Sequence, residues 1–234
     1  MRYSKLLIFL AGIFIVEMIY SQDDWKQFAN FERYAMDNEK LPTKEADQTR
    51  VVFMGNSITQ AWPVLSPAFF KSNSNFIGRG ISGQTTPQMV LRFRADVIDL
   101  DPDVVVILAG TNDIAGNTGH ASNESILANI KSMTEMARQN EIQVILCSVL
   151  PAIDFPWRPG QKPAERIRQV NELIEAYAQN QRLDYVNYYE VLVDDDGGLK
   201  VPDYTAADDL VHPNAAGYQQ MEKVLMKVLG KYLN

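Results

Sequence analysis

The sequence predicts an α/β fold: a three-layer α/β/α sandwich built around a mostly parallel sheet of five strands. Two observations lead to this prediction. Short apolar runs rich in β-branched residues recur along the chain, and amphipathic stretches with helical spacing lie between them. This alternation is typical of parallel strands that are covered on both faces and joined by helical crossovers.

The strand candidates differ in strength. Residues 50–54, 104–109 and 142–147 are nearly continuous apolar runs, as expected of strands buried on both faces, whereas 75–77 and 184–188 are weaker candidates. The only cysteine of the chain, Cys147, lies in the third of the strong runs. Because it has no second cysteine to pair with, we expect a buried strand residue and no intramolecular disulfide.

Helical patterns fill the intervals. They cover residues 87–100, 123–140, 163–182 and 214–233; another precedes the first strand at 25–38, and a helix is expected directly after Ser57. In the third of these, apolar residues recur at spacings of three and four: Ile167, Val170, Leu173, Ile174 and Tyr177. That spacing places them on one helix face, which we expect to pack against the sheet.

The first 21 residues have the pattern of a secretory signal peptide. Arg2 and Lys5 give a positive start, and the apolar run 6–16 follows. The run is shorter than the roughly 20 apolar residues of a membrane span, so an uncleaved anchor is the less favoured alternative. We expect cleavage near Ser21, a single domain over residues 22–234, and a periplasmic or secreted protein. No cysteine lies in this segment, which excludes lipid attachment through one.

The composition excludes several classes of protein. With 46% hydrophobic and 22% charged residues and one cysteine among 234, the chain is neither collagen-like, nor low-complexity, nor a disulfide scaffold. A net charge of -7 without clustered Lys and Arg disfavours a nucleic-acid partner. No Gly-x-x-x-x-Gly-Lys-Ser/Thr loop occurs, which disfavours a nucleotide binder. The acidic segment 194–198 lacks the twelve-residue calcium loop and is read as a turn.

Chemistry-bearing residues follow the predicted strands, at the sheet edge where such folds bind ligands. Ser57 follows the first strand, where its hydroxyl is either exposed beside helix-start amides or caps a turn. Gly83 closes a glycine-rich segment after the second strand, Gly78-Arg-Gly-Ile-Ser-Gly83, with amides free for an anion. Asn112 follows the third strand and either donates to a developing oxyanion or forms an Asx turn.

Two histidines are available as a base. His212 has the carboxylate of Asp209 three residues earlier, close enough to accept a hydrogen bond from the imidazole and fix its tautomer. His120 lies in the polar loop 116–120 and is read as a surface residue. Asp208 is one residue away from the Asp-x-x-His spacing and is read as a loop residue.

Four motifs carry a resemblance to a known family: Gly55-Asn-Ser57, Gly83, Gly110-Thr-Asn-Asp113, and Asp209-x-x-His-Pro-Asn214. In order and approximate spacing, over residues 50–220, they resemble the SGNH subgroup of the GDSL family of serine esterases. The resemblance implies an SGNH hydrolase fold with a flavodoxin-like sheet. It further implies that Ser57 is the nucleophile, that His212 is general base and then general acid, and that Asp209 orients His212. The oxyanion hole would comprise the backbone N–H groups of Ser57 and Gly83 and the side-chain amide of Asn112.

One position departs from the family pattern. The residue before the serine is usually Asp and is Asn56 here. That acid does not belong to the triad, and Asn keeps its size and a carbonyl acceptor. It lacks the negative charge, so the electrostatic field near His212 and the optimum pH can both differ from those of the family.

The resemblance implies hydrolysis of short acyl esters, acetyl esters above all, most readily on carbohydrate and through an acyl-enzyme. Trp62 and Trp157 either form an aromatic wall against a sugar or pack in the core. A lysophospholipase or thioesterase of the same family is the alternative, and a catalytically idle carbohydrate-binding relative is the alternative from another class. We expect a small-molecule or glycan ester as partner, no cofactor, no metal, and no stable membrane partner after removal of residues 1–21.

Overall fold

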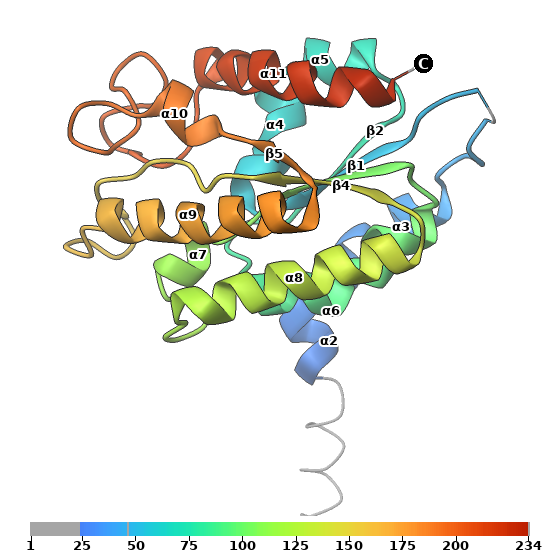
Figure 1. Ribbon diagram of the computed structural model, residues 1–234, viewed down its shortest axis with the longest axis horizontal. Coiled ribbons are helices and arrows are strands. Elements are labelled where there is room, and N and C mark those ends of the chain that lie inside the picture. Colours follow the sequence, from blue (N-terminus) through green and yellow to red (C-terminus); the bar gives the residue numbers. More distant parts are fainter. Residues whose placement is uncertain (1–23, 46, 234) are drawn as a thin grey trace, which may run out of the picture.

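The computed structural model describes residues 24–45 and 47–233, and in them helices cover both faces of one five-stranded sheet (Figure 1). The sheet is parallel throughout, with strand order β2-β1-β3-β4-β5. This confirms the predicted α/β sandwich and each of its five strands. The strands are β1 Val51–Gly55, β2 Phe76–Gly80, β3 Val104–Leu108, β4 Gln143–Cys147 and β5 Asp184–Val186.

Two buried apolar clusters form the core, one on each face of the sheet. Because side chains alternate along a strand, Val52 and Met54 of β1 face one cluster and Val51 and Phe53 face the other. The first cluster is covered by α6 (Thr86–Asp96), α8 (Asn123–Gln139) and α9 (Ala164–Gln181). The second is covered by α4 (Ser57–Leu65), α5 (Pro67–Ser72), α10 (Tyr188–Leu192) and α11 (Ala215–Leu229).

The N-terminal helix predicted at 25–38 is two helices, α2 (Asp24–Ala29) and α3 (Glu32–Glu39). Asn30 between them has a φ of 55°, a left-handed conformation that ends a right-handed helix. Both helices pack against α6. The long helices predicted at 123–140 and 163–182 are confirmed to within a residue at either end.

Two other predicted helices end early. The stretch 87–100 is helical only to Asp96 and continues as the 3₁₀ turn Ile98–Leu100, and 214–233 passes from α11 into the 3₁₀ turn Gly230–Tyr232. The short helices α5, α7 (Thr111–Ile114) and α10 were not predicted, since four to six residues are too few to register a helical period. The last predicted strand is shorter than 184–188, because the side chain of Asn187 caps α10.

Three smaller predictions have different outcomes. Cys147 is buried on β4, as expected. The acidic segment 194–198 is a turn in which Asp194 Oδ1 accepts from the backbone N–H groups of Asp196 (3.0 Å) and Gly198 (2.8 Å). The predicted signal peptide, residues 1–21, lies outside the described residues. Within the described part of the chain, no helix is both long and apolar enough to cross a membrane.

Candidate active site

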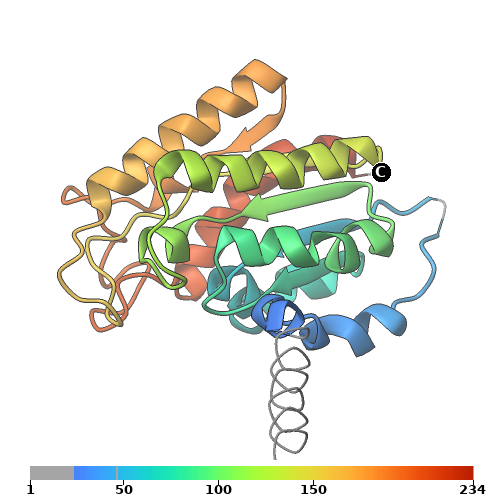
Figure 2. The same ribbon diagram turned by 90° about the horizontal axis from the view of Figure 1, so that it is seen from below.

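The segments that carry the predicted site residues meet at the carboxyl edge of the sheet. Figure 2 shows the loops that follow β3 and β4 and the loop that precedes α11 gathered at the left of the molecule. The loop after β2 is tied to the start of α4 there, because the backbone N–H of Ser82 donates to Gln60 Oε1 at 2.7 Å. The backbone N–H of Ile81 donates to the carbonyl of Gly55 at 3.1 Å.

Ser57 is the first residue of α4, two residues after the end of β1. Asn56, not Ser57, caps the helix: its Oδ1 accepts from the backbone N–H of Ile58 at 3.0 Å. The hydroxyl of Ser57 is therefore available for another partner. The carbonyl acceptor that Asn56 retains is used within its own helix.

Ser57, His212 and Asp209 form a continuous hydrogen-bonded row. Ser57 Oγ lies 2.8 Å from His212 Nε2, and His212 Nδ1 lies 2.8 Å from Asp209 Oδ1. Asp209 Oδ1 also accepts from the backbone N–H of His212 at 2.9 Å, which fixes the carboxylate relative to the ring. With the proton on Nδ1, the lone pair of Nε2 faces the serine hydroxyl, which is the arrangement a general base needs.

The loop around His212 is held from behind. Thr205 is buried, and its Oγ1 donates to the backbone carbonyl of His212 at 2.8 Å. The side chain of Asn214 caps α11 by accepting from the backbone N–H of Gly217 at 3.0 Å. His120 is exposed on its loop, as predicted, and the exposed Asp208 is a loop residue.

The three predicted oxyanion donors lie on neighbouring segments. Gly83 has a φ of 77°, a left-handed conformation that glycine adopts without strain. Asn112 on α7 is 3% exposed and donates one amide hydrogen to the carbonyl of Gln84 at 2.9 Å, so its second amide hydrogen is available. Among the described residues, the backbone N–H groups of Ser57 and Gly83 have no acceptor.

Asp113, next to Asn112, was not singled out from the sequence. Its buried carboxylate accepts from the backbone N–H of Thr86 at 3.0 Å and from Thr86 Oγ1 at 2.6 Å, which ties α7 to the start of α6. Burial raises the pKa of Asp113 to about 6, and the hydrogen bonds from Thr86 offset part of that rise. A carboxylate directly after Asn112 at a strand end was the available sequence signal.

The two tryptophans proposed for an aromatic wall lie in different environments. Trp62 is 1% exposed, stacks on Phe69 with ring centroids 5.9 Å apart, and donates from Nε1 to Glu222 at 2.9 Å. The expectation that Trp62 contacts a sugar is thereby corrected, since the ring belongs to the core. Trp157 is 42% exposed, and its ring centroid lies 6.4 Å from that of His212.

A hollow of about 480 Å³ opens beside Gly83 and Trp157. Asn117 joins its two sides, because its Nδ2 donates to the carbonyl of Gly83 at 3.1 Å and its Oδ1 accepts from Trp157 Nε1 at 2.9 Å. Gln27 and Phe28 of α2 also line it. Asn117 was not singled out from the sequence, and nothing in the sequence placed α2 at the site.

No group of three or more His, Cys, Asp or Glu side chains within the described ranges is arranged to hold a metal ion.

Residues 53–220 match the family model of the GDSL-like lipase/acylhydrolase family. The chain belongs to this family.

A GDSL-like lipase from Bacteroides thetaiotaomicron VPI-5482 is 49% identical to the chain, covers 88% of it and 100% of its own length, and superposes with a TM-score of 0.84. Among curated relatives, the acetylxylan esterase of Xylanibacter ruminicola is 22% identical over 222 residues, which cover 80% of this chain and 44% of the relative. The uncharacterized lipoprotein YqeF of Bacillus subtilis is 33% identical over 98 residues, 41% of this chain and 40% of that protein. The chain thus spans less than half the length of these two curated relatives.

Proposed function

We propose that the chain hydrolyses short acyl esters, acetyl esters above all, on carbohydrate, with Ser57, His212 and Asp209 as catalytic triad. The observation that carries the proposal is the pair of 2.8 Å contacts that join the serine hydroxyl, the imidazole and the carboxylate. A serine hydroxyl is a weak nucleophile at neutral pH and needs an adjacent base oriented by a third group. These three side chains meet that requirement.

In the first step, His212 Nε2 takes the proton of Ser57 Oγ as that oxygen attacks the ester carbonyl carbon. Asp209 stabilises the imidazolium through the hydrogen bond to Nδ1. The carbonyl oxygen becomes an oxyanion, which accepts from the backbone N–H groups of Ser57 and Gly83 and from Asn112 Nδ2. Each donor is fixed before the reaction, so little reorganisation accompanies the change in charge.

The second step releases the alcohol. The tetrahedral intermediate collapses, the bond between the acyl carbon and the alcohol oxygen breaks, and His212 Nε2–H protonates the leaving oxygen. The acyl group stays on Ser57 Oγ. Water then attacks the acyl-enzyme with His212 again as base, and the carboxylic acid leaves as the serine regains its proton.

The hollow beside the triad supports a carbohydrate ester. Gln27 and Asn117 offer amide groups that can bind hydroxyls, and the exposed ring of Trp157 offers an apolar face beside His212. The similarity to the acetylxylan esterase of Xylanibacter ruminicola points the same way. Most of the residues that line this hollow are polar, which makes it a poor match for a long acyl chain.

We also propose export directed by the first 21 residues, on the strength of the positive start and the apolar run that follows. Expression of the full chain in a bacterial host and N-terminal sequencing of the periplasmic fraction tests this. A mature N-terminus near Gln22 is the expected result, and an intact Met1 in the cytoplasmic fraction would contradict it.

Hydrolysis of p-nitrophenyl acetate, butyrate and octanoate by the chain and its Ser57→Ala variant tests the proposed function. We expect the parent to hydrolyse p-nitrophenyl acetate fastest and the variant to lose this activity. We also expect the parent to deacetylate acetylated xylo-oligosaccharides. A preference for octanoate would favour the lysophospholipase or thioesterase alternative. Glycan binding without turnover of any ester would favour the idle carbohydrate-binding relative. Turnover retained by Ser57→Ala would refute the proposed triad.

A further inference from the structure

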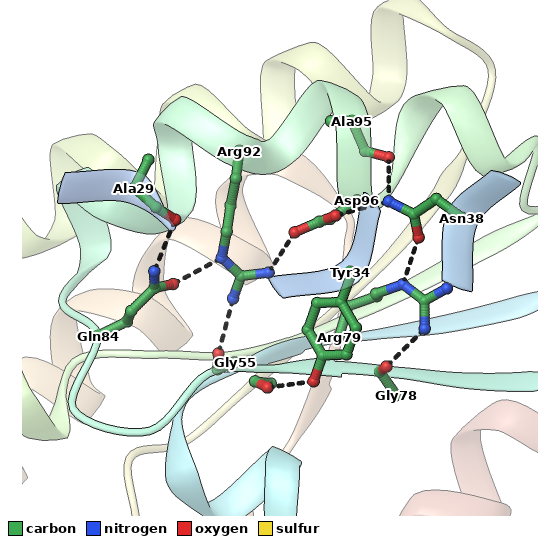
Figure 3. Close-up of polar contacts among 11 residues, drawn as sticks. Ala29, Tyr34, Asn38, Gly55, Gly78, Arg79, Gln84, Arg92, Ala95 and Asp96 are labelled. Carbon is green, nitrogen blue, oxygen red and sulfur yellow. Dashed lines mark hydrogen bonds and ion pairs between the residues drawn. The ribbon is translucent and has the colours of Figure 1, made fainter. Parts of the chain in front are cut away.

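A buried polar network lies behind the candidate site, between α6, the ends of β1 and β2, and the two N-terminal helices (Figure 3). At its centre is Arg92, whose side chain is 0% exposed. Its Nη1 donates to Oδ2 of Asp96, one helical turn further along α6, at 2.9 Å. Asp96 is 2% exposed, so both members of this ion pair are shielded from water.

The other arms of the guanidinium reach towards the site. Nε donates to Gln84 Oε1 at 2.6 Å, and Nη2 donates to the backbone carbonyl of Gly55 at 3.0 Å. Gly55 ends β1 two residues before Ser57, and Gln84 directly follows Gly83. Arg92 therefore contacts both segments that supply the backbone oxyanion donors.

The third donor is connected through the same residue. The backbone carbonyl of Gln84 accepts from Asn112 Nδ2 at 2.9 Å, while the Gln84 side chain is held by Arg92. Ser57, Gly83 and Asn112 follow three different strands, so their spacing depends on contacts between loops. The Arg92–Gln84 pair provides such contacts from the buried side.

Stability alone does not account for this pair. Removing two charges from water costs about as much as their mutual attraction returns, and a well-packed apolar pair of similar volume is often as stable or more so. A guanidinium differs from an apolar side chain because its planar N–H groups donate hydrogen bonds to several acceptors at fixed angles. The acceptors here include a backbone carbonyl and a side chain of the site loop, so the pair fixes backbone positions.

The same network holds the N-terminal helices, and it contains a second arginine that does not contact the site loops. Arg79 on β2 donates from Nε to Asn38 Oδ1 and from Nη1 to the carbonyl of Gly78, each at 2.8 Å, and lies over the ring of Tyr34. Asn38 in turn donates to Asp96 Oδ1 at 2.8 Å. Arg79 is 6% exposed and thus a matched control for the loss of a buried arginine.

We propose that Arg92 is a positioning residue for the oxyanion hole, setting the relative positions of the Ser57, Gly83 and Asn112 donors. The inference rests on the proposed function, because it takes these groups as the donors. Arg92 does not touch the substrate and acts through Gly55 and Gln84. Its loss should therefore weaken stabilisation of the transition state more than binding of the ester.

The test compares Arg92→Met with the control Arg79→Met. For Arg92→Met we expect kcat on p-nitrophenyl acetate to fall about ten- to 10²-fold with KM within about twofold, since a displacement of ~1 Å costs rates of this order. Inhibition by an alkyl trifluoromethyl ketone, whose adduct with the serine carries an oxyanion, should weaken by a similar factor. Arg79→Met should change kcat and inhibition by no more than about twofold, even if its melting temperature falls by as much as that of Arg92→Met.

Gln84→Met provides a second variant if Arg92→Met does not fold, because it removes the link to the site loop and leaves the Arg92–Asp96 pair in place. It should show the same parallel loss of kcat and of trifluoromethyl ketone inhibition. The inference would be overturned if a folded Arg92→Met kept the kcat and inhibition of the parent. If Arg92→Met is unfolded, the same result in Gln84→Met would overturn it. An equal loss in Arg79→Met would overturn it as well. Those results leave the proposed triad standing if Ser57→Ala is inactive, so the two failures are distinguishable.

Discussion

Asp113 offers the most quantitative prediction, through the substitution Asp113→Asn. Burial raises the pKa of this carboxyl from 3.8 to about 6. Because the pKa is higher in the folded than in the unfolded chain, the folded state holds the proton more tightly. The resulting stabilisation is fully present below pH 3.8 and is lost as the pH rises through about 6.

The size of the effect follows from the two pKa values. A rise from 3.8 to about 6 corresponds to about 3 kcal/mol of unfolding free energy, lost between acid and neutral pH. Asparagine is neutral throughout, and its Oδ1 can still accept from the backbone N–H and Oγ1 of Thr86, as Asp113 Oδ1 does. Relative to the parent, the variant should therefore gain about 3 kcal/mol between pH 3.5 and pH 7.5.

Urea unfolding at half-unit pH intervals measures this difference directly, because the other carboxyls titrate alike in both proteins. Asp195→Asn, at an exposed position in the turn before Gly197, is the control and should follow the parent. A difference between Asp113→Asn and parent that stays within about 0.5 kcal/mol at all pH values would contradict a raised pKa of Asp113, and so would a difference of opposite sign.

The remaining predictions concern the donors and the two tryptophans. Asn112→Ala should lower kcat on p-nitrophenyl acetate by about 10²- to 10³-fold, because one oxyanion donor is lost while the nucleophile remains. This loss should be smaller than that of Ser57→Ala. Steady-state kinetics on both variants measures the two losses, and equal losses would contradict the prediction. Trp62→Phe should lower the unfolding free energy by about 1–3 kcal/mol, since it leaves a cavity in the core, and should leave KM for acetylated xylo-oligosaccharides unchanged. Trp157→Ala should do the reverse, raising that KM several-fold while the unfolding free energy in urea stays within about 0.5 kcal/mol of the parent. A loss of stability without a change in KM would contradict a contact between Trp157 and the substrate.

The sheet and the hydrogen-bonded row of Ser57, His212 and Asp209 could be predicted because each depends on local patterns. Continuous apolar runs identify parallel strands, and in such a sheet every strand ends at the same edge. Ser57, Gly83 and Asn112 follow three of those strands, so the fold brings them near one another. Asp209 and His212 are three residues apart, and one turn of chain suffices for their contact.

The burial of Trp62 could also have been predicted from apolar spacing. Ile58 lies four residues before Trp62 on α4, and both are buried on the same helix face. The apolar spacing of this helix therefore favoured a place in the core for Trp62 over a contact with a sugar.

The buried network could not be predicted in this way. Arg92 and Asp96 are spaced like an ordinary pair on an exposed helix face, and only the packing of α2 and α3 over α6 removes them from water. The contacts of Arg92 with Gly55 and of Asn38 with Asp96 join residues 37 and 58 positions apart. No periodicity in the sequence encodes such contacts, and the role of Asn117 between Gly83 and Trp157 escaped for the same reason.

Intact-mass spectrometry with a fluorophosphonate probe, which phosphonylates an activated serine with loss of fluoride, followed by peptide mapping, tests whether Ser57 is the nucleophile. We expect one adduct, on the peptide that contains Ser57, absent in Ser57→Ala and formed much more slowly in His212→Ala. Labelling of another residue, or equal labelling of Ser57→Ala, would contradict this role of Ser57.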